Sequence, residues 1–165
     1  MKKSEIFQKV KAAMANNRCV KKCEISLEDF LEKDLGAVFF VMLDVFDDID
    51  EEFGISTDAE VVQQFKQVKD VVDYLFEQVI SQKVKAIIVD EFCLEGEEDK
   101  VTPETHICAE TAKGSEFLCL EGDIVDKDEL FQRLEKEFKL SLSDEDFFEF
   151  VQVKDIVRIL KNKLS

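Results

Sequence analysis

The stretch Asp34-Leu-Gly-Ala-Val-Phe-Phe-Val-Met-Leu-Asp-Val-Phe-Asp-Asp-Ile-Asp-Glu-Glu-Phe-Gly-Ile-Ser56 decides the fold that we predict for this chain. Its apolar residues recur at steps of three or four, which is the spacing of one buried helical face. They are Phe39, Leu43, Phe46, Ile49 and Phe53. We therefore expect a loop that leads into a long helix from about Val38 to Phe53. Gly54 suits the C-terminal end of this helix, because glycine readily adopts the left-handed conformation.

The same stretch carries a family resemblance. The loop Asp34-Leu-Gly-Ala37 and an acidic helix that ends in Glu51-Glu-Phe-Gly-Ile55 resemble helix II and its approach loop in acyl carrier proteins. In that family the loop ends in an Asp-Ser-Leu tripeptide, whose serine carries the 4′-phosphopantetheine arm. Here Val38-Phe39-Phe40 takes these three places. Phe39 has no hydroxyl to esterify, so the resemblance implies a carrier fold without the arm at this position.

An internal repeat extends the resemblance to nearly the whole chain. The segment Gln67-Val-Lys-Asp-Val-Val-Asp-Tyr-Leu75 returns as Gln152-Val-Lys-Asp-Ile-Val-Arg-Ile-Leu160, an offset of 85 (152 − 67 = 85). Upstream, Lys9-Val-Lys-Ala12 returns as Lys83-Val-Lys-Ala86, an offset of 74 (83 − 9 = 74). Two copies of one unit explain both offsets, with about eleven extra residues (85 − 74 = 11) inserted in the second copy.

The repeat predicts an all-α fold of two tandem acyl carrier protein-like four-helix bundles, packed together as a rigid pair. The first bundle is expected at residues 1–80, and the second at 81–165 with its insertion near 108–120. Helices of the first copy are expected from Ser4 to about Asn17, over the long acidic stretch, after Thr57, and from Val68 to about Ile80. No Pro or Gly separates this last helix from the next one, Gln82 to about Phe92, so we expect the two to be nearly continuous.

The first turn and a half of the long helix is unusual because Val38 to Met42 are all apolar. A helix end that is apolar on every side must be covered by the rest of the chain or by a partner. Val38, Phe40 and Val41 are therefore candidate contacts for another subunit or for an acyl chain. Of the two interpretations we favour burial within the chain, by the second copy or by the loop at Asp34. Such burial would contribute about 5 kcal/mol.

The second copy also lacks the attachment serine, because Asp123-Ile124-Val125 stands where Asp-Ser-Leu is expected. Ile124 offers no hydroxyl. Helix II is the surface by which the family meets basic enzymes, so the resemblance implies a docking face here. Its acidic residues are Asp123, Asp126, Asp128 and Glu129. The alternative is that they only complement the helix dipole and keep the protein soluble.

These features predict a non-catalytic pseudo-carrier that acts as an acidic protein-interaction module and holds no cofactor. The expected partners are basic protein surfaces, including acyl-carrier-dependent enzymes, and a dimer is left open. The alternative function is a working carrier with a 4′-phosphopantetheine arm on Ser115, which follows Gly114 in the insertion. A Gly-Ser pair in a loop usually marks a turn, which argues against that alternative.

Composition excludes several function classes. Lys and Arg number 22 against 38 Asp and Glu, and the net charge of −16 repels the phosphates of nucleic acids. No apolar run approaches the ~20 residues of a membrane span. The N-terminus has no apolar core of signal-peptide length, so we expect a cytoplasmic protein.

Metal and enzyme sites are not predicted. Cys19 and Cys23 are four apart and His106 lies two residues before Cys108, but the close cysteine pairs of structural zinc sites are missing. The acidic pairs, such as Asp144 and Asp146, lack the spacing of a calcium-binding loop. The single histidine has no placed nucleophile, and no Gly-rich phosphate loop exists.

Overall fold

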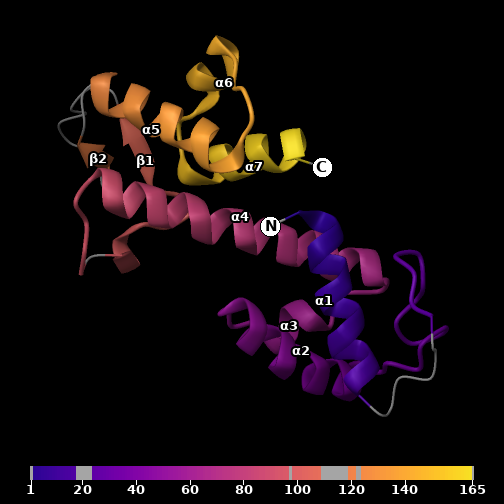
Figure 1. Cartoon of the computed structure of the whole chain (residues 1–165). Coiled ribbons are helices and arrows are strands. Elements are labelled where there is room, and N and C mark those ends of the chain that lie inside the picture. The colour runs from indigo at the N-terminus through magenta and orange to yellow at the C-terminus, as the bar shows by residue number, and fades with distance from the viewer. Residues whose placement is uncertain (1, 18–23, 97, 109–118, 122–123, 165) are drawn as a thin grey trace. The chain divides into compact units, whose positions relative to one another are not determined.

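The computed structural model describes residues 2–17, 24–96, 98–108, 119–121 and 124–164. Most of these residues are helical, which confirms the predicted all-α class. The elements in chain order (Figure 1) are α1 Lys3–Asn16, α2 Phe39–Phe53, α3 Ala59–Val62, α4 Val68–Glu91, the 3₁₀ turn η1 Glu98–Lys100, β1 His106–Cys108, β2 Cys119–Glu121, α5 Ile124–Phe138, α6 Asp144–Glu149 and α7 Val153–Leu164. Among the described residues, no helix combines the length and the apolar character that a membrane crossing requires.

The chain divides into two compact units, Met1–Val79 and Ile80–Ser165. The boundary falls inside α4, which is one uninterrupted helix of 24 residues. The expected continuity between the helix that starts at Val68 and the one predicted at Gln82 is therefore confirmed.

The core of the first unit is built from the apolar faces of α1, α2 and α4. These helices bury aliphatic and aromatic side chains at the helical spacing seen in the sequence. The buried residues are Ile6, Val10 and Met14 on α1, Met42, Val45, Phe46 and Ile49 on α2, and Val71, Val72 and Leu75 on α4. Phe46 also stacks on Phe65, with ring centroids 5.5 Å apart. α1 lies against α2 (Figure 1). Of the face predicted for the long helix, Phe46 and Ile49 are buried, whereas Phe39, Leu43 and Phe53 are half-buried.

The second unit repeats this arrangement with the second half of α4 in the role of α1. Its buried residues are Val84 and Ile88 on α4, Leu130 and Leu134 on α5, and Val153, Ile156, Val157 and Leu160 on α7. α6 contacts α7, and its first turn is capped by Ser143, whose hydroxyl accepts a hydrogen bond from the backbone N–H of Asp146. Burial raises the pKa of the Asp146 carboxyl, but hydrogen bonds from Lys163 and Ser143 outweigh this effect and hold the pKa below its usual value.

Corresponding backbone hydrogen bonds join the same segments in both units. The three helices that follow the insertion also begin at an offset of 85 from their counterparts (124 − 39 = 144 − 59 = 153 − 68 = 85). In the first unit the backbone N–H groups of Leu31, Val68 and Lys69 donate to the carbonyls of Lys66 (2.9 Å), Asp29 (3.1 Å) and Leu27 (2.9 Å). In the second unit the corresponding N–H groups of Ile107, Val153 and Lys154 donate to the carbonyls of Val151 (2.9 Å), Thr105 (3.1 Å) and Pro103 (2.9 Å). Local geometry therefore matches between the units as the sequence does.

The long helix of each unit ends in the same turn. Gly54 follows α2 with φ of 62°, as expected for a glycine at this position. Lys139 follows α5 with φ of 53°, in the left-handed region that side chains other than glycine rarely adopt. The second unit therefore keeps the turn but not the residue that suits it.

A short parallel strand pair is the feature that the sequence did not predict. β1 pairs with β2 in the register His106 to Cys119, Ile107 to Leu120 and Cys108 to Glu121. The two strands flank residues 109–118, which belong to the insertion and lie outside the described residues. Pairing between segments separated in this way leaves no periodic signal in the sequence, because each strand is only three residues long.

Candidate functional site

The start of α2 is the position at which the sequence analysis expects the missing attachment serine. A tight loop leads to it, with Gly36 at φ of 69° and the N–H of Ala37 bonded to the carbonyl of Leu31 at 2.8 Å. Val38 has extended backbone angles and precedes the helix. Phe39 is the first helical residue and is half-buried. A hydrocarbon ring therefore occupies the position at which we expected the attachment serine from the sequence.

The apolar side chains at this helix start are not buried as expected. Val38 is 43% exposed and Phe40 is 76% exposed, whereas Val41 is half-buried. The prediction of burial is therefore wrong for Val38 and Phe40. The physical reason is that α2 turns Met42, Val45, Phe46 and Ile49 inward, and the residue at position 40 lies outside that stripe.

Phe30 and Val38 line the same cavity, and we call these two residues, together with Phe40 in the first turn of α2, the apolar patch. Phe30, like the other two, is exposed to solvent, and the ring of Phe40 lies 5.5 Å from the half-buried ring of Phe39. This cavity, of about 470 Å³, is also lined by Leu31, Met42 and Val62. Exposed aromatic side chains beside a cavity are typical of a contact surface.

The second unit has different side chains at two positions that correspond to the lining of this cavity. Lys127 and Phe147 correspond to Met42 and Val62 at the larger offset of the repeat (127 − 42 = 147 − 62 = 85). The Nζ atom of Lys127 lies 4.6 Å from the centroid of the Phe147 ring. Burial lowers the pKa of Lys127, and the nearby Asp128 raises it by less. The second unit therefore has a cation and a phenyl ring where the first has a thioether and an isopropyl group.

An acidic face continues from the apolar patch along α2. Counting from Phe40 in steps of three or four leads to Asp44, Asp47 and Glu51, all exposed, with Asp48 beside them. We call Asp44, Asp47, Asp48 and Glu51 the acidic face. We did not predict this face as a site, although its helical spacing is present in the sequence.

Of the acidic residues predicted on the second unit, the structure describes the side chains of Asp128 and Glu129 only. Asp128 and Glu129 are exposed, but Arg133 and Lys136 follow on the same side of α5. Asp123 and the alternative Ser115 lie outside the described residues, and so do the side chains of Asp126 and Ile124. Ile124 is nevertheless the first residue of α5, as Phe39 is of α2.

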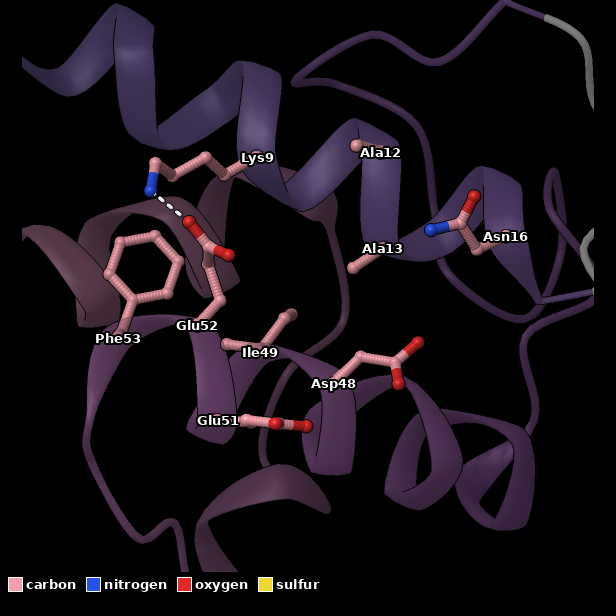
Figure 2. A pocket seen from close by; sticks show the side chains of 9 residues that line it. All are labelled: Lys9, Ala12, Ala13, Asn16, Asp48, Ile49, Glu51, Glu52 and Phe53. Carbon is pink, nitrogen blue, oxygen red and sulfur yellow. Dashed lines mark hydrogen bonds and ion pairs between the residues drawn. The ribbon is translucent and has the colours of Figure 1, made fainter.

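A second cavity, of about 600 Å³, lies between α1 and α2. We call it the α1–α2 groove. Figure 2 shows Lys9 and Glu52 joined by an ion pair at one end, with Phe53 beside them. Asn16 and Asp48 lie toward the other end, and Ala13 and Ile49 form the floor between.

The structure describes only some of the groups considered for metal or thiol chemistry. Among the residues that the structure describes, no three His, Cys, Asp or Glu side chains are placed to hold a metal ion. The Nε2 atom of His106 lies 2.9 Å from the side-chain nitrogen of Gln152. Cys19 and Cys23 lie outside the described residues, and Cys93 is exposed.

Among curated proteins, the chain is similar to acyl carrier proteins from several organisms. No family model matches the chain, and no solved structure gives a significant match. The chain is 34% identical over 74 residues to the acyl carrier protein of Phytoplasma mali. This match covers 45% of the chain and 88% of that protein. It is 32% identical over 73 residues to the acyl carrier protein of Thermotoga maritima, covering 44% of this chain and 90% of that protein. The acyl carrier protein of Thermosynechococcus vestitus is 32% identical over 79 residues, covering 48% of this chain and 98% of that protein.

Proposed function

This chain belongs to the acyl carrier protein family, and we propose that it is a carrier-like protein without the phosphopantetheine arm that acts as an acidic protein-interaction module. The observation that carries this proposal is Phe39 at the first position of α2. A carrier needs a hydroxyl at the place of attachment, and a phenyl ring has none.

The proposal includes two carrier-like units in tandem. The matched relatives span a single carrier-sized stretch, about 45% of this chain. The second unit is supported by the repeated sequence, by helices that begin at the same separation, and by the paired hydrogen bonds between equivalent segments. Ile124 then stands where Phe39 stands in the first unit, so neither unit offers the usual attachment oxygen.

The docking surface in this proposal is the apolar patch together with the acidic face of α2. An exposed phenyl ring next to a row of carboxylates suits a partner with an apolar contact surrounded by basic side chains. The net charge of −16 attracts such a surface over a distance. Enzymes that recognise acyl carriers are the natural candidates, because the chain shares the family of their usual partners.

The test is a reaction with a promiscuous phosphopantetheinyl transferase and coenzyme A, read by intact-mass measurement. We expect no mass increase in the natural chain. The matched control is the triple variant Val38→Asp/Phe39→Ser/Phe40→Leu, which restores the family tripeptide and is expected to gain one phosphopantetheinyl group. Its modification would show that the natural chain lacks only the family tripeptide.

A mass increase in the natural chain would overturn the proposal. Ser115→Ala, run in parallel, then tests the alternative carrier function. Loss of the adduct in that variant would identify Ser115 as the attachment residue.

A further inference from the structure

The β1–β2 strand pair of the second unit places four residues of metal-binding types at neighbouring positions. The register of the two parallel strands sets His106 beside Cys119 and Cys108 beside Glu121. Successive residues of a strand belong to opposite faces of a sheet, so residues two apart share a face. Ile107, between His106 and Cys108, is buried in the core. The four positions therefore share the face of the strand pair that is opposite to Ile107.

The spacing of these four positions suits the ligands of one metal ion. Neighbouring strands lie about 4.8 Å apart, and residues two apart on one strand lie about 6.6 Å apart. The four positions therefore mark the corners of a rectangle of about these dimensions. Zinc lies about 2.3 Å from a thiolate sulfur and about 2.0 Å from an imidazole nitrogen or a carboxylate oxygen. Side chains of these types are long enough to meet over the centre of such a rectangle.

The first unit has other residue types at all four positions. Its corresponding segments are Phe30-Leu-Glu32 and Asp34-Leu-Gly36, by offsets of 76 and 85 (106 − 30 = 76; 119 − 34 = 85). They form a tight turn, in which the N–H of Asp34 donates to the carbonyl of Phe30 at 3.0 Å. The second unit reads His106-Ile-Cys108 and Cys119-Leu-Glu121, with nine further residues (85 − 76 = 9) between the two segments. The middle residue of each segment is apolar in both units, but only in the second unit do the outer residues include an imidazole and two thiols.

Hydrogen bonds alone hold such a strand pair weakly. Each strand is three residues long, and an isolated pair of strands is only marginally stable in water. The free energy of metal binding adds to the free energy of folding when the ligands come together only in the folded chain. A metal ion with ligands on both strands therefore stabilises their pairing.

His106 has a polar neighbour that suits a metal ligand. Its Nε2 atom lies 2.9 Å from the side-chain nitrogen of Gln152, which also donates to the carbonyl of Glu104 at 3.2 Å. A histidine that ligates a metal through one ring nitrogen usually donates a hydrogen bond from the other. Ligation through Nδ1 places the ring proton on Nε2, where Gln152 accepts it with its side-chain oxygen after a turn of the amide group. Gln152 is then a positioning residue for the imidazole.

We propose that His106, Cys108, Cys119 and Glu121, which the strand register brings to one face, form a zinc site with one nitrogen, two sulfur ligands and one oxygen. Thiolate and imidazole ligands select zinc over magnesium or calcium, which prefer oxygen. Four protein ligands leave no open position for a reacting molecule, so the site is structural.

The spacing of the cysteines in the sequence does not reveal this site, because Cys108 and Cys119 are eleven residues apart (119 − 108 = 11). Strand pairing supplies the proximity that the spacing lacks. The structure describes the backbone of both strands but not the side chains of Cys108, Cys119 and Glu121. The absence of a metal cluster among the described side chains therefore does not extend to these residues.

The experiment titrates the full reduced chain, freed of metal by a chelator, first with Co²⁺ and then with Zn²⁺. Cobalt is the probe because zinc, with a filled d shell, has no visible absorption. We expect one Co²⁺ per chain, with the absorption bands of tetrahedral cobalt bound to thiolates. Zn²⁺ should then displace the cobalt and remove these bands, because it binds such ligands more tightly.

The cysteine variants contain their own controls. We expect Cys108→Ser and Cys119→Ser each to weaken cobalt binding by at least about tenfold and to reduce the thiolate bands. Cys93→Ser and the double variant Cys19→Ser/Cys23→Ser remove thiols outside the strand pair, so both should bind cobalt as the natural chain does. Circular dichroism of each variant checks that the helices are intact.

The variant Gln152→Ala tests the positioning of the imidazole. It removes no ligand, so we expect cobalt binding to weaken about tenfold while the absorption bands keep their shape. Unchanged affinity would show that Gln152 does not orient His106.

The natural chain itself can overturn the inference, by binding no cobalt or by binding it without thiolate bands. Equal losses in Cys108→Ser and in the control variants would also overturn it. The zinc site does not rest on the proposed function, because its residues belong to the second unit and the docking surface belongs to the first. A failed titration therefore leaves the proposed function standing, and a phosphopantetheinyl arm found on the chain leaves the titration result standing.

Discussion

At the residue scale, the start of α2 combines the half-buried ring of Phe39 with the exposed side chains of Val38 and Phe40. The sequence is sufficient to show that Phe39 has no hydroxyl, which is the basis of the proposal that the arm is absent. The exposure of Phe40 could not be predicted, because apolar periodicity identifies the stripe that is buried but not what covers the other sides of a helix. The prediction of burial failed at the residues that lie off that stripe.

Two phenylalanines of α2 test this distinction. Phe46 is 3% exposed and Phe40 is 76% exposed. We expect Phe46→Ala to lower the free energy of unfolding by about 3–5 kcal/mol, because it empties a packed site. Phe40→Ala should change it by about 0.5 kcal/mol or less. Urea unfolding followed by circular dichroism measures both, and a loss at Phe40 as large as that at Phe46 would show that Phe40 is covered in solution.

At the scale of elements, the helices were predictable and the connections between distant elements were not. The long helix was expected to end at Phe53 and does so, because Gly54 marks the stop locally. The strands β1 and β2 and the bridge from Arg133 to Asp90 depend on residues far apart in the chain. The capacity of Arg133 to reach α4 therefore appears only when the fold is known.

The turn after α5 gives a prediction at this scale. Lys139 has φ of 53°, where Gly54 stands in the first unit. We expect Lys139→Gly to stabilise the chain by about 1 kcal/mol relative to Lys139→Ala, because both variants remove the charge but only glycine avoids the cost of a left-handed conformation. Thermal unfolding compares the two. Equal stability of the two variants would contradict the conformational argument.

At the scale of the whole molecule, the net negative charge is large, but the exposed charged residues differ between α2 and α5. The chain carries a net charge of −16. The exposed charged residues of α2 are all acidic, whereas those of α5 include Lys136. The sequence analysis predicted the acidic partner surface on the second unit. The first unit suits the proposed docking because the exposed Phe40 and the exposed carboxylates lie on the same helix, α2.

Charge reversal on the two units distinguishes these surfaces. We expect Asp44→Lys/Asp47→Lys to abolish capture of basic proteins from native lysate at low salt, because it inverts the acidic face. Asp128→Lys/Glu129→Lys changes the net charge equally and should leave most capture intact. Quantitative mass spectrometry of the captured proteins measures the difference, and equal losses would mean that net charge alone governs binding.

The ion pair of Lys9 with Glu52 in the first unit has a counterpart in the ion pair of Lys83 with Glu137 in the second. One chain therefore contains two copies of the same interaction. Each copy experiences the same solvent, temperature and concentration, at a stoichiometry that the covalent chain fixes at one to one. The effect of a lysine-to-alanine change in one ion pair can therefore be compared with the effect of the same change in the other. Any difference between the two measures the influence of surroundings on an otherwise identical interaction.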